Sequence, residues 1–379
     1  MSAKPRALVD CFAGLKDRRV QKKCEHVFMD VVLIALCSTL AGADDCVSMA
    51  AFSQIHQTWL KERLGLKLPK GPPSHDTFNR ILATIDPREF GGCFLTWVES
   101  LCETLTGKIR QIPIDGKTMR GTRKGRKSCK ATHIVSAWAC EHGLTLAQVK
   151  TDEKSNEITA IPEVLRVLDI SGALVSIDAM GCQKDIAEQI VTQKGDYLLA
   201  VKDNQPRLFE DLQRLADKAL EENYAGLDSH LQNDKGHGRS EMRFCYVIED
   251  LKSVRDRLLW PKLHCVVVVL SSRVVGGKAS DDVRLYISSR KASAKEFQKR
   301  VRAHWSIENS CHWVLDVAFR EDDHRLRTGH GPENMSLIRK MALTMLKKAD
   351  AKMGIKNKRL LAAWNLEFLE QIFRDFPAK

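Results

Sequence analysis

The spacing of hydrophobic residues changes once along the chain, near residue 108, from a helical period to a strand period. Before that point apolar residues recur every three to four positions, which predicts helices. The expected helices cover residues 27–43, 46–64, 74–85 and 86–104. Pro72 and Pro73 mark a loop, and Ser74 or Asp76 would cap the third helix. A short capped helix after a loop is typical of a helix-turn-helix with Arg80 exposed, although a plain helical bundle shows the same pattern.

From residue 108 onward, short apolar runs predict strands that later alternate with helices. Strands are expected at 111–115, 133–140, 144–150, 173–178 and 197–201, with helices at 156–168, 183–194 and 206–222. Three early strands followed by helix, strand, helix, strand and helix is the element order of the ribonuclease H-like fold. Pro113 conflicts with a central strand, because proline has no amide hydrogen to donate to the ladder.

The remaining pattern predicts a strand-rich insertion and a helical end. Strands at 243–249, 263–271 and 283–288 lie within an insertion at about 226–289, and helices are expected at 335–348 and 360–373. We therefore expect an α/β protein of three parts. These are a helical N-terminal domain over 1–105, a core domain over 106–348 that carries the insertion, and a C-terminal helical tail over 349–379.

The segment from Val301 to Asp323 predicts one long helix, since it contains no proline or glycine. At 100° per residue, Glu308 and His312 fall in the same arc as the apolar residues Trp305 and Leu315. A carboxylate in such a stripe is costly to bury unless a cation or a hydrogen-bond donor meets it. This pattern predicts that Glu308 has a compensating partner elsewhere in the chain.

Asp115 and Asp178 each end an apolar run just before a glycine-containing segment. Functional groups on open α/β sheets gather where strands give way to such turns. Together with Glu308, these two carboxylates indicate a site for Mg²⁺ or Mn²⁺. A strand-end aspartate that merely caps a turn is the structural alternative for each.

A zinc site is a weaker alternative, based on His304, Glu308 and His312, which are spaced four apart. The two histidines would lie roughly 12 Å apart along a helix, too far to bind one ion together with Glu308. The spacing favours packing or phosphate contact for the histidines.

Composition adds a basic balance, with 60 Lys and Arg against 48 Asp and Glu and a formal charge of +12. Such a charge favours binding to polyanions. The 12 cysteines include no C-x-x-C pair, which argues against a zinc ribbon or finger. The N-terminus lacks the apolar core of a signal peptide, and the longest apolar run, from Val31, is too short for a bilayer. We expect a cytoplasmic protein with reduced thiols and no membrane contact.

Four motifs resemble one known family. They are IPIDGKTMRG, VSIDAMGCQ, DYLLAVKDNQ and RAHWSIENSCHWVLDVAFRED, and the similarity extends to PSHDTFNRIL and DPREFGGCFLTWVE. These segments resemble the insertion-sequence transposases of the H-repeat-associated group, which belong to the DDE superfamily. The resemblance implies a bacterial, nucleoid-associated enzyme that cuts and joins DNA through the triad Asp115, Asp178 and Glu308. It also implies two bound Mg²⁺ ions (or Mn²⁺), element terminal repeats and target DNA as partners, and a homodimer or higher assembly on DNA.

Several basic residues are expected to contact DNA phosphates. A cluster follows Asp115 and comprises Lys117, Arg120, Arg123, Lys124, Arg126 and Lys127. Broader relatives have an arginine four residues before the glutamate and a lysine seven after it, where this chain has His304 and Leu315. Lys202, Arg302, His304 and His312 are the expected substitutes. A nuclease that never joins DNA, or a decayed DNA-binding remnant, are the alternatives to an active transposase.

Overall fold

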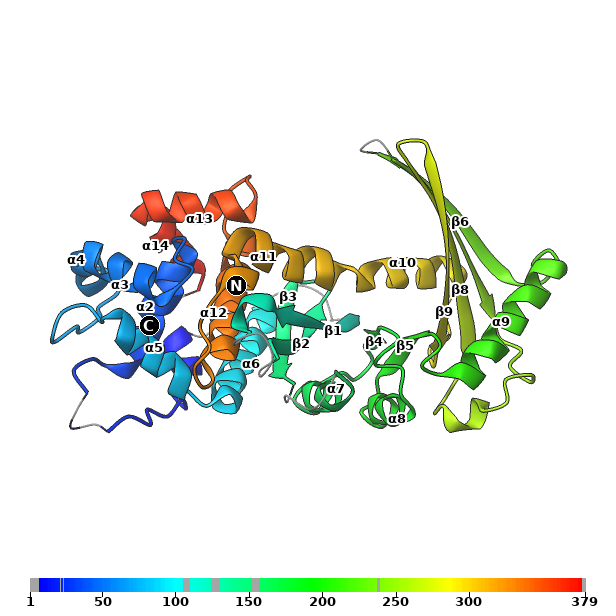
Figure 1. Ribbon diagram of the computed structural model, residues 1–379, viewed down its shortest axis with the longest axis horizontal. Helices are drawn as coiled ribbons and strands as arrows, with labels where there is room; N and C mark the ends of the chain where they lie inside the picture. Colours follow the sequence, from blue (N-terminus) through cyan, green and yellow to red (C-terminus); the bar gives the residue numbers. More distant parts are fainter. Residues whose placement is uncertain are drawn as a thin grey trace.

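The computed structural model describes residues 7–20, 22, 24–104, 110–123, 130–151, 157–236 and 239–376. Three parts follow one another along its long axis (Figure 1). Helices from both ends of the chain lie at one end, a mixed sheet with flanking helices lies in the middle, and long antiparallel strands form the other end. None of the helices in the described part of the chain has the length and hydropathy needed to cross a bilayer.

The N-terminal part is helical, as the apolar spacing predicted. Its helices are α1 (Leu8–Cys11), α2 (Phe28–Leu40), α3 (Cys46–Ile55), α4 (Gln57–Glu62), α5 (His75–Thr84) and α6 (Pro87–Thr104). The predicted cap is confirmed, because the hydroxyl of Ser74 accepts a hydrogen bond from the amide of Thr77. The single helix predicted over 46–64 is instead two helices that meet at His56.

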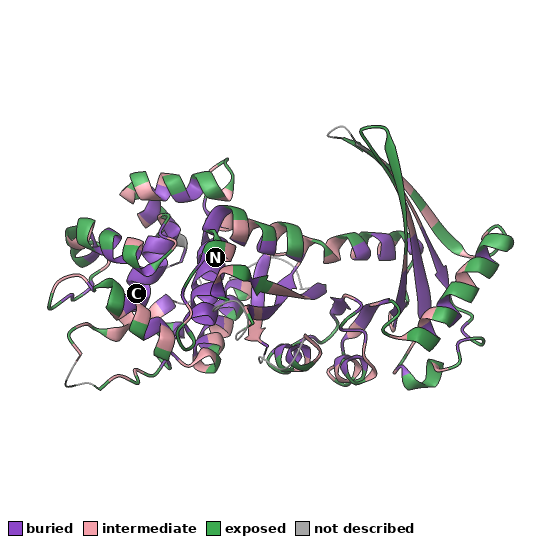
Figure 2. Cartoon of the chain, viewed as in Figure 1, coloured by how far each residue is buried: buried purple, intermediate pink, exposed green. Residues whose placement is uncertain are grey.

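These N-terminal helices share a core with α12 (Gly331–Lys348), which is buried along almost its entire length (Figure 2). The side-chain amide of Asn334 donates to the carbonyls of Leu82 and Ile85 at the end of α5. The hydrophobic residues of both regions form one continuous cluster. Protein therefore covers α12 on every side, although the helix carries buried charged residues such as Arg339 and Lys340.

The central sheet begins with three antiparallel strands and continues with two parallel ones. Its strands and helices are β1 (Gln111–Met119), β2 (Thr132–Ala139), β3 (Leu144–Lys150), α7 (Glu157–Arg166), β4 (Leu174–Ile177), α8 (Lys184–Thr192), β5 (Asp196–Val201) and α9 (Pro206–Glu221). The strand order is β3-β2-β1-β4-β5, with β1, β4 and β5 parallel. The predicted α/β class and ribonuclease H-like core are confirmed.

Pro113 does lie in a central strand, and the register explains how it is tolerated. It pairs with Ser176 on the parallel neighbour β4, whereas pairing with β2 begins one residue later, at Ile114 with Ala137. Pro113 therefore lies just outside the ladder between β1 and β2. The margin of a ladder is a position where a sheet accepts a missing donor.

The insertion extends the same sheet instead of forming a separate one. Its strands are β6 (Asp228–Gly236), β7 (Arg239–Ile248), β8 (Cys265–Val275) and β9 (Lys278–Ser288), and β9 pairs antiparallel with β5 to give nine strands. The sequence did not predict β6. This edge strand, DSHLQNDKG, is largely exposed and carries no alternating apolar face, so it lacks the period that identifies strands.

The long helix predicted over 301–323 is interrupted. α10 (Ala294–His304) is followed after one turn by a π-helical segment (Glu308–His312), and then by α11 (Trp313–Phe319). Arg320 ends the helix in a left-handed conformation, with φ of 49°. The remaining short elements are the 3₁₀ turns Arg120–Thr122, Arg257–Leu259 and Glu321–Asp323, and the C-terminal helices are α13 (Ile355–Trp364) and α14 (Leu366–Asp375).

One buried side chain of α13 ties three regions together. The guanidinium of Arg359 donates to the carbonyls of Thr39 and Ala43 near α2, at 3.0 and 3.1 Å. It also donates to the carbonyl of Ala318 near the end of α11, and its charge lies over the ring of Phe319. The end of the helix that carries Glu308 is thereby joined to both ends of the chain.

We predict that Arg359→Lys lowers the free energy of unfolding by about 2–4 kcal/mol, because an ammonium cannot reach all of these buried carbonyls and an unsatisfied one costs about 1–3 kcal/mol. Urea unfolding at an unchanged m-value measures the loss. Arg374→Lys on α14 makes the same change at an exposed position, and should stay within about 0.5 kcal/mol. Equal midpoints for the two variants would contradict this role.

Candidate active site

The parallel pairing of β1 with β4 brings Asp115 and Asp178 together. Ile114 pairs with Ile177, so each aspartate follows a paired residue on adjacent strands. Neighbouring strands lie about 4.8 Å apart, and residues at equal register lie on one face. The two carboxylates, 63 residues apart in the chain, therefore start from adjoining points on the sheet.

The two aspartates differ in their local structure. β4 ends at Ile177, and one oxygen of Asp178 accepts hydrogen bonds from the amides of Met180 and Gly181, as the turn-capping alternative predicted. Asp115 was expected to end its strand too, but β1 continues to Met119 in register with β2. The glycine after Asp115 thus belongs to a strand and not to a turn.

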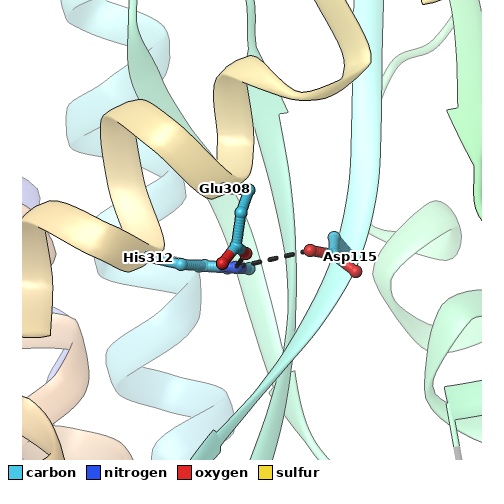
Figure 3. A group of neighbouring side chains, drawn as sticks. All are labelled: Asp115, Glu308 and His312. Atoms are coloured by element: carbon cyan, nitrogen blue, oxygen red, sulfur yellow. Dashed lines mark hydrogen bonds and ion pairs between the residues drawn. The ribbon is translucent and has the colours of Figure 1, made fainter. Parts of the chain in front are cut away.

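Glu308 reaches this site from the π-helical segment, together with His312 (Figure 3). Nδ1 of His312 lies 3.0 Å from Oε2 of Glu308 and 3.4 Å from Oδ2 of Asp115. His312 is only 2% exposed. The imidazole therefore bridges a carboxylate of the sheet and a carboxylate of the helix.

The prediction that Glu308 is buried in an apolar stripe is wrong, since 52% of its side-chain surface is exposed. The buried face of the helix consists of Ile307, Cys311, Leu315 and Phe319. The prediction assumed a rotation of 100° per residue along the whole segment. A π turn contains one more residue than an α turn, and this changes which side chains share a face. Such turns are frequent at functional sites.

The charged groups of the site shift one another's pKa values. Burial alone would lower the pKa of His312, but its hydrogen bonds to Asp115 and Glu308 raise it to about 9. Burial alone would raise the pKa of Asp115, but His312 outweighs it and holds that pKa below the usual range. Burial raises the pKa of Asp178, and the nearby carboxylates of Glu157 and Asp115 raise it further. The cluster carries excess negative charge that one imidazolium partly offsets.

Asp115, Glu308 and His312 lie close enough together that they could hold a cation. Each offers a ligand atom, and these atoms lie within 4.8 Å of one another. The two carboxylates supply the oxygen ligands that Mg²⁺ and Mn²⁺ prefer, and the imidazole could join them only in its neutral form. Asp178 is not within this group, although its strand end adjoins Asp115.

The expected DNA-contacting residues differ in how far they are exposed. Lys117 is 11% exposed and contacts the carboxylates of Asp316, Glu321 and Asp322 at 2.6, 3.8 and 3.1 Å, so its charge is already neutralised. Arg120, Arg123 and Lys202 are exposed, and Nε of Arg120 also lies 3.4 Å from Oδ2 of Asp322. Lys124, Arg126 and Lys127 lie outside the described residues.

The two histidines of the helix are also engaged within the protein. Nδ1 of His304 lies 3.0 Å from the hydroxyl of Ser176 on β4, and burial lowers the pKa of His304. His312 is occupied by Asp115 and Glu308. These contacts favour a supporting role over the phosphate contact expected from the sequence.

Arg302 lines a cleft of about 780 Å³ between α10 and strands β7 to β9. Trp305, 43% exposed, lies in the same cleft with the guanidinium of Arg284 4.8 Å from its ring centre. Asn309, next to Glu308, also lines it. The cleft therefore opens beside the candidate metal ligands.

Sequence reasoning missed Glu157 and His133, which lie next to the aspartates. Nε2 of His133 is 2.8 Å from Oε1 of Glu157, and Nδ1 is 2.7 Å from the hydroxyl of Thr118. A glutamate that opens a helix is ordinary, because acidic residues favour the first turn. The chain contains no local signal that distinguishes it.

Comparisons with known proteins identify the family of this chain. Residues 106–345 match the family described as Transposase DDE domain, and residues 9–98 match the DDE_Tnp_1-associated family. The putative transposase YncI of Escherichia coli O157:H7 is 41% identical over 97% of this chain and 94% of its own length. The H repeat-associated putative transposase YhhI of Escherichia coli K12 is 38% identical over 96% of this chain and 97% of its own.

One solved structure, a piggyBac transposase synaptic complex with hairpin DNA, covers 98% of this chain and 83% of that one. Its TM-score of 0.45 and identity of 10% are too low to argue from. The sequence relatives are decisive, because they align over nearly their full length at well above 30% identity. The chain belongs to the DDE transposases, in their H repeat-associated group.

Proposed function

We propose that this transposase cleaves and joins DNA through Asp115, Asp178 and Glu308, with divalent cations as cofactors. The observation that carries the proposal is the convergence of a carboxylate from β1 and one from a helix nearly 200 residues later on the same imidazole. Asp178 follows the residue of β4 that pairs with Ile114, which puts its backbone beside that of Asp115. Placing several carboxylates close together costs free energy unless a positive charge lies among them.

The proposed chemistry is in-line displacement at a DNA phosphodiester. One or two Mg²⁺ ions held by the triad would act as Lewis acids and lower the pKa of the attacking water or 3′-hydroxyl. His312 holds Asp115 and Glu308 in fixed relative positions through its two contacts. No covalent nucleophile of the protein is required, so hydrolysis and strand transfer differ only in the attacking oxygen.

DNA is proposed to lie across the cleft beside Glu308. Arg302 lines that cleft, and Arg120, Arg123 and Lys202 are exposed elsewhere on the surface. Lys and Arg contacts of this kind fix the position of the backbone and make affinity depend on salt. Assembly as a homodimer or larger complex on DNA, and the proposed division of the chain into functional domains, remain predictions.

Recognition of the element ends is assigned to the N-terminal helices. The support is the capped helix α5, which follows a proline-containing loop, buries one face and carries Arg80 on the exposed face. A fragment with only these helices would expose the apolar face that α12 covers. A test of this assignment therefore uses the full-length protein.

We predict that Asp178→Asn lowers the rates of cleavage and strand transfer at least about 10³-fold, since a ligand that supports several kcal/mol of metal catalysis is lost. End-labelled terminal repeats, a plasmid target and Mg²⁺ supply the assay, and a gel shift should show unchanged DNA binding. Asp169→Asn, at an exposed position in the loop that leads into β4, is the matched control and should be fully active. Cleavage without joining by the native chain would identify a nuclease, and inactivity of the native chain would identify a decayed remnant.

We predict that Arg80→Ala in the full-length protein weakens binding to terminal repeats by about 1–3 kcal/mol, while binding to random DNA of equal length changes little. The reason is that a base contact discriminates between sequences whereas a phosphate contact does not. Arg88→Ala removes an exposed arginine from the start of α6 and is the control. Equal losses on both DNAs would assign recognition elsewhere, and the strand-rich insertion is then the next region to test.

A further inference from the structure

A hydrogen-bonded chain of side chains lies directly behind the Asp115 backbone. Glu157, the first residue of α7, contacts His133 on β2, and His133 contacts Thr118 on β1. A Cβ atom added at Gly116 would overlap both the carboxylate of Glu157 and the ring of His133. The glycine after Asp115 is therefore required by the close approach of this pair, and not by a turn.

Without a bound cation, the position of the Glu157 carboxylate is electrostatically unfavourable. Its side chain is 13% exposed, so its charge is poorly screened by water. The carboxylate lies near enough to Asp178 to raise the pKa of that residue. Within the described residues, the side chain that contacts this carboxylate is His133, and that contact leaves the repulsion from Asp178 in place. A fourth carboxylate at this edge of the sheet needs a reason beyond stability.

We propose that Glu157 is a positioning residue for the divalent-cation site, held in place by His133. It fixes the backbone that presents Asp115, through contact with Gly116, and it adds negative charge beside Asp178 that favours a cation. This inference rests on the proposed function of the triad. Residues that orient metal ligands from behind typically change metal affinity 10- to 100-fold when mutated.

The alternative is a purely structural role, in which Glu157 only holds His133 and the start of α7. The two roles predict different effects of Glu157→Gln on the melting temperature in the absence of metal. A structural contact would lower the melting temperature in EDTA. A charge that serves the cation site would leave that temperature unchanged or raise it, because repulsion from Asp178 is relieved.

The experiment measures Mn²⁺ binding to the full-length protein by electron paramagnetic resonance of the free ion, together with melting temperatures in EDTA and in Mn²⁺. The variants are Glu157→Gln, His133→Gln, Asp115→Asn and Glu163→Gln. The last removes the same charge from the exposed side of the same helix and is the matched control. His133→Gln keeps the Glu157 charge but removes its partner, so it tests the positioning separately.

We expect Glu157→Gln to weaken Mn²⁺ binding about tenfold or more, with no loss of melting temperature in EDTA and a smaller stabilisation by Mn²⁺. His133→Gln should weaken binding to a lesser degree, and Glu163→Gln should behave as the native chain. Native affinity in Glu157→Gln overturns the inference. If Glu157→Gln does not fold, native affinity in His133→Gln overturns it instead.

The same data separate this inference from the proposed function. If Asp115→Asn loses Mn²⁺ binding while Glu157→Gln retains it, the cation site stands and only the role of Glu157 fails. If Asp115→Asn binds Mn²⁺ as tightly as the native chain, the proposed cation site itself is wrong, and the inference falls with it.

Discussion

The site depends on the four-residue parallel pairing of β1 with β4. Ile112 and Ile114 pair with Val175 and Ile177, and all four side chains are almost fully buried. A shift of one residue would turn these side chains to the opposite face of the sheet and move Asp115 into the apolar layer. Hydrophobic burial therefore fixes the register, and the register in turn places the two aspartates side by side.

The third carboxylate is held by a different kind of constraint. Glu308 is half-exposed, and its helix is anchored through its buried side, by Leu315 and Phe319, and through Arg359 beyond its end. A second buried network joins this helix to β1, since Lys117 contacts Asp316 and the carboxylates that follow α11. Breaking one partner of a buried charged network is costly, so these contacts favour a single arrangement of helix and strand.

The carboxylates of Asp115, Glu308 and Glu157 lie in one region of the structure despite their mutual repulsion. His312 offsets part of the charge between Asp115 and Glu308, and His133 holds Glu157 through a hydrogen bond. The resulting site is rigid on the sheet side and open on the helix side, where the cleft with Arg302 and Trp305 begins. That asymmetry suits a substrate as large as DNA, which must approach the metal ligands from outside.

The sequence by itself determined the class of the fold, the N-terminal helices, most of the strands and the motifs that contain Asp115, Asp178 and Glu308. These rest on local signals, namely apolar period, capping residues and turn residues, which are readable within a short window. β6 was missed because an exposed edge strand carries no such period. The predicted burial of Glu308 failed because a π turn depends on packing and not on propensity.

Only the tertiary structure decided which side chains share the site. Lys117 and His312 looked available for DNA in the sequence, yet both are occupied by carboxylates from distant segments. Gly116 looked like a turn residue, yet it makes room for Glu157. Contacts between residues far apart in the chain follow from the register of strands and the packing of helices, and these leave no mark in any one stretch of sequence.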